Sequence, residues 1–252
     1  MVQMDAELSL LALAQDVTAD AVVKSEALIA LASQSLSKPE VLADLLGDQE
    51  ADVAIEPART LRLHIAGPVI REAIQSRMAT ANGELAAQLV HALDPGKDAR
   101  PTSVTAWEEA LATGGNPDRG RRVFHTTQLM CARCHTVDGG VALLGPSLAG
   151  IAQSVRDQII QSVLKPSDQL PPQYQAWVVH TKEGVSHTGL QLDHQSGGAI
   201  NMLGLDGKLL CFQGIDIADY EASTHSLMPE GLEILMPVDD FRNLVAFLSA
   251  LK

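Results

Sequence analysis

Apolar residues recur every three or four positions from residue 4 to about 112, and this spacing predicts amphipathic helices. The segments that carry it are SLLALAQ, AVVKSEALIALASQ, VLADLLGD, ARTLRLHI, VIREAIQSRMA and LAAQLVHAL. Helix-breaking sequences separate them at Ser37-Lys38-Pro39, Gly47-Asp48, Gly67-Pro68, Asn82-Gly83 and Asp94-Pro95-Gly96. The first half of the chain is therefore expected to be helical throughout.

Consecutive helices in this half resemble degenerate HEAT-like repeats stacked as a solenoid, with an irregular helical bundle as the alternative. Residues 94 to 118 form a predicted linker that holds one short helix, SVTAWEEALA. We therefore expect a HEAT-like α-helical domain at 1–114 and a second domain at 115–252.

The pattern changes in the second half. Helices are expected at DRGRRVFHTT, with Asn116 or Asp118 as its N-cap, at SVRDQIIQSVLKP and at PVDDFRNLVAFLSALK. Between about 174 and 221, short β-branched and apolar segments alternate with the turn sequences KEG, HQSGG and DG. The expected fold class is mainly α, with a small antiparallel β region inserted in the second domain.

Composition and charge narrow the function. The chain has 252 residues, of which 46% are apolar and 3% aromatic, so a folded core must rely on aliphatic side chains. Its net charge of −13 disfavours nucleic acid and anionic membranes as partners. No apolar stretch approaches the roughly 18 to 20 residues of a membrane span. The acidic start MVQMDAELSLLALAQD predicts a helix and not a signal peptide.

The sequence LMCARCHTVDGG, residues 129–140, contains Cys131, Cys134 and His135 as a C-x-x-C-H cluster. A structural zinc site needs four ligands, and only Cys211 remains as a further thiol. A thioredoxin-like dithiol would open a helix after a strand, whereas a helix is expected before this cluster. C-x-x-C-H is also the attachment signature of c-type haem, in which both thiols add to the porphyrin vinyl groups and the histidine binds iron. This third interpretation is favoured.

Three further features support it. The carbonyl group of Pro146, in GPSL, can accept a hydrogen bond from the far ring nitrogen of His135. Gly120, Phe124 and Phe247 suit a close crossing of the helix before the cluster and the last helix. Met228, in SLMPEGL, can supply a distal thioether.

With these features in place, residues from about 115 to 252 resemble a class I cytochrome c. More narrowly, they are similar to a haem-binding domain of large multidomain proteins in planctomycetes and verrucomicrobia. The matching segments are NPDRGRRVF, CARCH, GPSLAGI, SVLKPSDQLPPQY, SLMPEGL and DDFRNLVAFLSAL. Proteins of that family often carry HEAT-like repeats, and before them a β-propeller similar to sugar dehydrogenases, ahead of the haem domain.

The resemblance implies one covalent haem c whose iron is held by His135 and Met228. It implies electron transport rather than enzymatic catalysis, with a redox protein or an adjacent dehydrogenase domain as partner and a periplasmic or otherwise exported location. His225 is the main alternative to Met228, and Met130, Met202 and Met236 are less well placed. Two other functions stay open: an open distal position for peroxide or gas chemistry, and a structural interaction module.

Two other features have simpler interpretations. Cys211, in the predicted strand KLLCFQG, is expected to be a buried thiol, with an intermolecular disulfide as the alternative. Asp239 and Asp240 are expected to complement the dipole at the start of the last helix.

Overall fold

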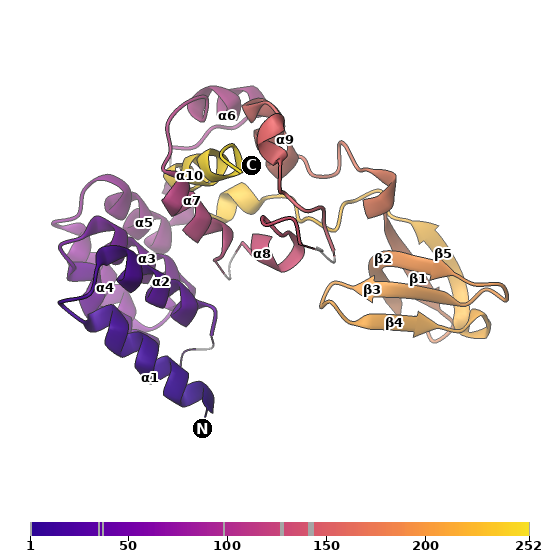
Figure 1. Ribbon diagram of the computed structural model, residues 1–252, viewed down its shortest axis with the longest axis horizontal. Helices are drawn as coiled ribbons and strands as arrows, with labels where there is room; N and C mark the ends of the chain where they lie inside the picture. Colours follow the sequence, from indigo (N-terminus) through magenta and orange to yellow (C-terminus); the bar gives the residue numbers. More distant parts are fainter. Residues whose placement is uncertain are drawn as a thin grey trace. The chain divides into compact units, whose positions relative to one another are not determined.

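The computed structural model describes residues 2–34, 36, 38–97, 99–126, 129–140 and 144–251, and its chain divides into two compact units (Figure 1). Unit 1 comprises Met1–Met130 and Glu233–Phe247, and unit 2 comprises Cys131–Leu232 and Leu248–Lys252. Both units are therefore built from segments that are discontinuous in the sequence.

The N-terminal part of unit 1 consists of short helices joined by tight turns. They are α1 (Val2–Gln15), α2 (Ala21–Ala32), η1 (Pro39–Leu42), η2 (Asp44–Gly47), α3 (Ala51–Leu61), η3 (Arg62–His64), α4 (Pro68–Met78), α5 (Gly83–Leu93) and η4 (Pro95–Lys97), where η marks a 3-10 helix. Asp20 caps α2 by accepting a hydrogen bond from the Val22 amide, and Pro68 is the first residue of α4. The apolar faces share one core, which includes Leu28, Ile55 and Leu89.

One expected α-helix is wrong. VLADLLGD, residues 41–48, lies in the two 3-10 helices η1 and η2. Pro39 precedes it and Gly47 ends it, so few residues are available for an α-helix. A 3-10 helix aligns side chains three positions apart, and Leu42 and Leu45 are both buried in this arrangement.

The helix α3 is the most buried element of unit 1. All nine residues from Val53 to Leu61 are buried, although Glu56 and Arg59 are charged and Pro57 lies inside the helix. A buried charge is tolerated only when it is paired and hydrogen-bonded. The partners of these two side chains therefore decide how the rest of unit 1 packs on α3.

The remaining helices of unit 1 come from two distant parts of the sequence. They are α6 (Val104–Ala110), α7 (Pro117–Phe124), and α10 (Val238–Leu248) with most of the preceding η8 (Leu232–Leu235). Asn116 caps α7 by accepting hydrogen bonds from the Asp118 and Arg119 amides, which confirms one of the two expected caps. Trp107 of α6 packs edge-on against Phe241 of α10.

The expected close crossing of α7 and α10 is confirmed. A Cβ atom added to Gly120 would lie 1.9 Å from the carbonyl oxygen of Asn243 and 2.7 Å from Cβ of Phe247. The two backbones touch here, so only glycine fits. One turn away, the rings of Phe124 and Phe247 lie 5.7 Å apart.

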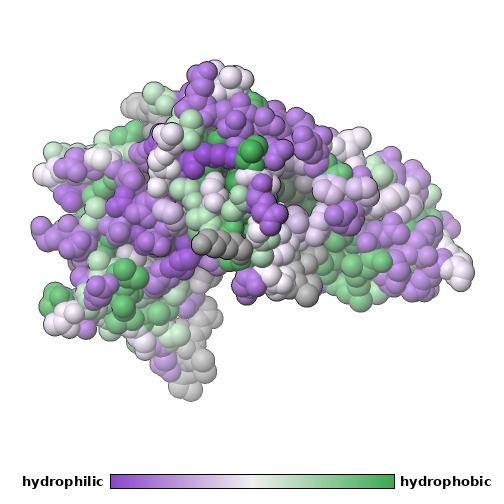
Figure 2. All heavy atoms as spheres, turned by 45° about the horizontal axis from the view of Figure 1, so that its top comes forward, coloured by the Kyte–Doolittle hydropathy of each residue, from purple (hydrophilic) through white to green (hydrophobic). Residues whose placement is uncertain are grey.

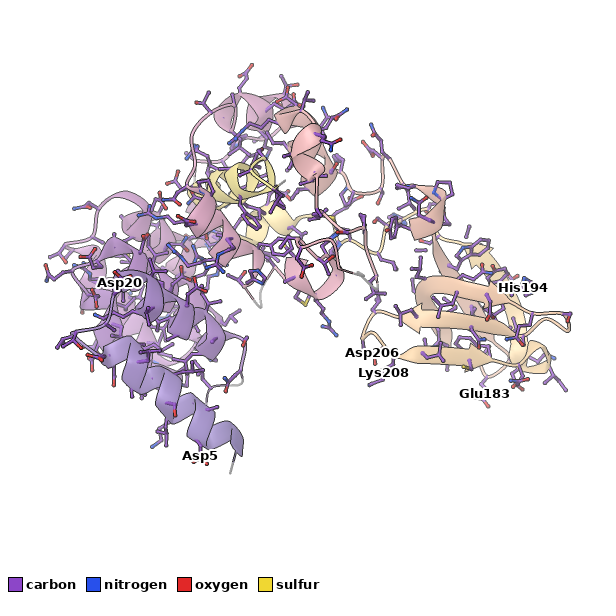
Figure 3. The ribbon with its side chains drawn as sticks, viewed as in Figure 1. Asp5, Asp20, Glu183, His194, Asp206 and Lys208 are labelled. Atoms are coloured by element: carbon purple, nitrogen blue, oxygen red, sulfur yellow. The ribbon has the colours of Figure 1, made fainter. Side chains whose placement is uncertain are left out.

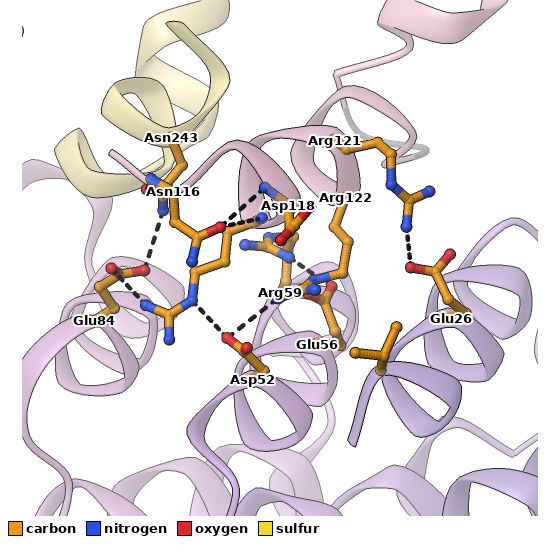
Figure 4. A network of polar contacts seen from close by, with 12 residues as sticks. Glu26, Asp52, Glu56, Arg59, Glu84, Asn116, Asp118, Arg121, Arg122 and Asn243 are labelled. Carbon is orange, nitrogen blue, oxygen red and sulfur yellow. Dashed lines mark hydrogen bonds and ion pairs between the residues drawn. The ribbon is translucent and has the colours of Figure 1, made fainter. Parts of the chain in front are cut away.

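Arginines of α7 attach this helix to the N-terminal helices (Figure 4). The ion pairs join Arg119 to Asp52 and Glu84, Arg121 to Glu26, and Arg122 to Asp52 and Glu56. Solvent weakens the outer pairs, but Arg122 and Glu56 are both almost fully buried and lie 3.0 Å apart. The carboxylates come from α2, α3 and α5, so α7 contacts three helices through charge.

A second buried ion pair attaches α10 to α3. The Nε and Nη2 atoms of Arg59 donate to the two carboxylate oxygens of Asp240 at 3.1 and 2.7 Å. Burial alone would raise the pKa of Asp240, but the charge and hydrogen bonds of Arg59, with smaller effects of Gln88 and Arg62, outweigh burial, and the pKa lies below its usual value. Asp240 lies in the first turn of α10, as expected, but its side chain is buried and also forms the ion pair to α3, which the sequence did not predict.

Unit 2 begins with short helices and continues as a sheet. Its helices are α8 (Cys131–Cys134), η5 (Ile151–Gln153), α9 (Arg156–Leu164), η6 (Pro172–Tyr174) and η7 (Gly214–Asp216). Its strands are β1 (Ala176–Thr181), β2 (Ser186–His194), β3 (Ile200–Gly204), β4 (Leu209–Phe212) and β5 (Ile217–Ala222). They form one antiparallel sheet in the order β4-β3-β2-β1-β5, so the β region expected at about 174–221 is confirmed.

One face of the sheet holds a small core. Val179, Ile200 and Met202 are buried there, and the rings of Trp177 and Tyr220 stack 4.4 Å apart beside them. Apolar side chains also reach the surface of the sheet and its turns, where Figure 2 shows green areas; Leu192, Leu205 and Leu209 are exposed.

The chain thus combines helices with a five-stranded antiparallel sheet, as the expected fold class requires. The HEAT-like repeats, the cytochrome fold and the domains 1–114 and 115–252 stay predictions. The compact units divide the chain elsewhere, because α7 and α10 pack on the N-terminal helices through the contacts above. None of the helices in the described ranges has the length and apolar character of a membrane span.

Candidate functional site

The cysteine cluster forms a single helical turn at the start of unit 2. Cys131 and Cys134 are the first and last residues of α8, and residues three apart on a helix face the same side. The amide of His135 donates to the Cys131 carbonyl at 3.0 Å, which extends the turn by one residue. The turn therefore fixes the two thiols and the following histidine as one unit.

His135 makes the contact that its sequence context predicts. Its Nδ1 atom lies 2.8 Å from the carbonyl oxygen of Pro146. A carbonyl oxygen only accepts hydrogen bonds, so Nδ1 is the protonated nitrogen and Nε2 carries the lone pair. This is the ring orientation and tautomer in which a histidine binds a metal through Nε2.

Gly145 supports the ring of His135 from one side. A Cβ atom at Gly145 would lie 2.7 Å from Cε1, 3.0 Å from Nδ1 and 3.2 Å from Nε2 of the imidazole. The ring thus lies against a backbone that has no side chain. Sequence analysis missed this role, although a glycine placed directly before the accepting proline was the available signal.

Hydrogen bonds hold the Gly145 loop against the cysteine turn. The amide of Gly145 donates to the Cys134 carbonyl at 3.1 Å, and the amide of Leu148 donates to the Thr136 carbonyl at 2.7 Å. Leu144, next to Gly145, is buried. These backbone hydrogen bonds hold the Gly145 loop, and with it the imidazole of His135, against the cysteine turn.

The electrostatics of the cluster favour uncharged sulfur. Burial raises the pKa of Cys131 to about 12, and burial also raises the pKa of Cys134, against the opposing charge of Arg133. Burial lowers the pKa of His135, although the bond to Pro146 opposes this change, so the ring is neutral at pH 7. A zinc site or a dithiol catalyst needs thiolates, whereas a thioether is uncharged and suits an apolar environment.

Met228 lies on a separate segment of unit 2, between β5 and η8. Its amide donates to Ser226 Oγ at 3.1 Å, and the Ser226 amide donates to Ser167 Oγ, just after α9, at 3.2 Å. The side chain of Met228 is partly buried, whereas that of His225 is exposed and lies beside Thr224. The described hydrogen bonds bring Cys131, Cys134, His135 and Pro146 together, and Met228 is not part of that group.

Gly145→Ala tests the support of the His135 ring. The added methyl group would overlap the imidazole, so we expect the free energy of unfolding to fall by about 1–3 kcal/mol. Gly140→Ala in the same loop is the control, since its Cβ would meet only the carboxylate of Asp138, a movable side-chain end. Urea unfolding measures both; equal stabilities for the two variants would show that the ring is not held against Gly145.

The other candidate groups are dispersed. Met202 is fully buried in the core of the sheet, and Cys211 lies exposed on β4 and not buried as expected. Within the described ranges, no three His, Cys, Asp or Glu side chains gather into a group that could hold a metal ion. No family model matches the chain, and no curated protein is similar to it.

Proposed function

We propose that the chain is an electron-transfer protein of the c-type cytochrome kind. It would carry one haem c, bound through thioethers to Cys131 and Cys134, with His135 and Met228 as the residues that would hold the iron. The region from about 115 to 252 is a cytochrome c fold with an inserted β region, and residues 1–114 form a HEAT-like repeat domain.

The observation that carries this proposal is the fixed ring of His135. Directly after a one-turn C-x-x-C helix, its Nδ1 donates to Pro146 and one ring side lies on Gly145. This arrangement leaves Nε2 as the only ring nitrogen with a free lone pair. The uncharged state of both thiols also fits two thioether bonds. The residues present therefore fit a covalently attached haem.

In this function the chain supplies ligands and their orientation. The hydrogen bond to Pro146 makes the His135 nitrogen a stronger donor to iron, and it prevents rotation of the ring. The thioether of Met228 is a soft ligand that favours ferrous over ferric iron and raises the reduction potential. A bound haem supplies one-electron redox chemistry at its iron.

The partner and the location follow from this chemistry. Haem attachment to C-x-x-C-H takes place outside the cytoplasm, so we propose a periplasmic or otherwise exported protein. The electron donor or acceptor is a redox protein or an adjacent dehydrogenase domain. An acidic chain of net charge −13 favours a basic docking surface on that partner.

The test is production of the full chain, with an export signal, in cells that mature c-type cytochromes. We expect a red protein in which one haem per chain stays attached after denaturation. Cys131→Ser combined with Cys134→Ser should lose this haem, and Cys211→Ser is the matched control that should keep it. A colourless wild-type chain overturns the proposal.

The protein ligands of the iron are identified from the absorption spectrum of the same preparation. We expect a far-red band from sulfur bound to ferric iron, and Met228→Ala should abolish it while His225→Ala leaves it in place. Rapid, tight binding of carbon monoxide or cyanide by the unaltered protein would favour the open-site alternative over electron transfer. The Met228 variant should gain that binding.

A further inference from the structure

The strand β4 is an edge of the sheet in unit 2. It pairs with β3, and no other described strand pairs with its second side. The amide of Gly204, next to β3, donates to the carbonyl of Lys208. In an antiparallel pair every second residue directs its N–H and C=O groups toward the neighbouring strand, so after Lys208 these residues are Leu210 and Phe212. The N–H and C=O groups of Leu209 and Cys211 therefore point to the open edge.

The side chains of β4 are uncharged on both faces. Leu210 and Phe212 pack with the core of the sheet, and Leu209 and Cys211 are exposed on the opposite face, Leu209 to 59%. Protein sheets usually protect an exposed edge with charged side chains, proline or a bulge. None of these occurs within β4.

The other edge of the sheet has such protection. Strand β5 carries Asp219 and Glu221, and both are exposed. Near β4, Asp206 and Lys208 lie in the preceding turn and form an ion pair with each other, which leaves that turn without net charge (Figure 3). Two copies of a chain with net charge −13 repel each other least where charge is absent. Between the two edges, β4 is the one that a second copy can approach.

We infer that β4 is a self-association surface, at which two copies of the chain pair antiparallel about a two-fold axis and join their sheets into one. Hydrogen bonds between the two copies form only between residues whose N–H and C=O groups point to the open edge, and Cys211 is one of these. If the two-fold axis passes Cys211, this residue lies opposite Cys211 of the second copy. Leu209 then lies opposite Gln213 of the second copy, and Leu210 lies opposite Phe212 of the second copy. Every cross-strand pair in this register is uncharged.

The charge distribution favours a second copy over an unrelated strand. A basic partner would be attracted to the acidic β5 edge and gains nothing from the neutral β4 edge. Self-pairing at β4 also places the two β5 edges at the outer ends of the joined sheet. The four-residue strand offers a short interface, so the dimer is expected to dissociate on dilution.

The experiment measures the mass of the full chain by light scattering over a range of concentrations, with reductant present. We expect a concentration-dependent rise toward twice the chain mass of 26.8 kDa. Leu209→Lys places two like charges at the interface and should raise the dissociation constant about tenfold. The matched control Ala218→Lys, on the exposed side of β5, should leave it unchanged. A monomer at all concentrations, or a dimer broken by the control alone, overturns the inference.

Cys211 reports the register. With glutathione disulfide as oxidant, two Cys211 thiols lose two protons and two electrons and form one disulfide, while the reagent is reduced to two glutathione thiols. Directly opposed residues of a hydrogen-bonded antiparallel pair have Cα atoms about 5.5 Å apart, within disulfide range. A covalent dimer should form in the wild type and not in Cys211→Ser, which keeps the non-covalent dimer. A cross-link that survives Cys211→Ser, or a β4 dimer that does not cross-link, contradicts this register.

Discussion

Arg59→Ala is expected to lower the free energy of unfolding by about 3–5 kcal/mol, because buried Asp240 loses its ion-pair partner and Glu56 keeps only its pair with Arg122. Arg59 and Asp240 are 3% and 1% exposed, so solvent cannot replace the missing guanidinium. The substitution also detaches α10 from α3. Urea unfolding at pH 7 measures the difference, and Arg71→Ala, at an exposed position of α4, is the control expected to change stability by less than about 0.5 kcal/mol.

The pH dependence distinguishes a lost charge pair from a lost side-chain volume. In the wild type the pKa of Asp240 lies below its unfolded value, so its contribution to stability is present above about pH 4 and is lost as the pH falls through the folded pKa. In the variant only Gln88 and Arg62 oppose the effect of burial, so the pKa of Asp240 rises, and its protonation in acid removes the charge that has lost its main partner. The difference in free energy of unfolding between wild type and variant should therefore become smaller toward acidic pH. A difference that stays constant would mean that packing, and not charge, holds α10 on α3.

Gly120→Ala is expected to lower the free energy of unfolding of the chain by about 3 kcal/mol. The new Cβ would lie 1.9 Å from the Asn243 carbonyl oxygen and 2.5 Å from its carbonyl carbon. Both contacts are to backbone, so α7 and α10 must move apart for the variant to fold. The higher helix propensity of alanine, at most about 1 kcal/mol, offsets only part of this loss.

Gly47→Ala is the matched control for this prediction. A Cβ atom at Gly47 would meet nothing within 4 Å, and its backbone has no left-handed conformation. The free energy of unfolding of Gly47→Ala should equal that of the wild type or be slightly higher, because alanine restricts the unfolded chain more than glycine does. Thermal or urea unfolding compares the two variants. If Gly120→Ala were as stable as Gly47→Ala, the two helices would not cross in backbone contact.

Local patterns were sufficient for most secondary structure. The three- and four-residue spacing predicted α1, α2, α4 and α5, and the turns KEG, HQSGG and DG predicted where the first four strands separate. The exception at residues 41–48 depends on packing, because the choice between an α-helix and a 3-10 helix decides which leucines reach the core. A one-dimensional pattern does not contain that packing.

The candidate site was foreseen in part. The C-x-x-C-H spacing and the proline eleven residues after His135 predicted the bond to Pro146, because ligand histidines need an acceptor for their second nitrogen. The contact of Gly145 with the ring was not foreseen, since it depends on how the loop folds back on Cys134. Exposure of Cys211 was also missed, because a strand pattern does not tell an edge strand from a central one.

By itself the sequence determined most of the helices and strands and the cysteine turn with its histidine and acceptor, since each depends on a short stretch of chain. Only the tertiary structure decided which charges are buried together. Arg59 and Asp240 lie far apart in the sequence, yet their ion pair joins the first half of the chain to its last helix. Ionisable residues look alike in a sequence whether solvated or buried. Their role is set by the neighbours that folding brings within about 3 Å, where Coulomb energy and desolvation nearly balance.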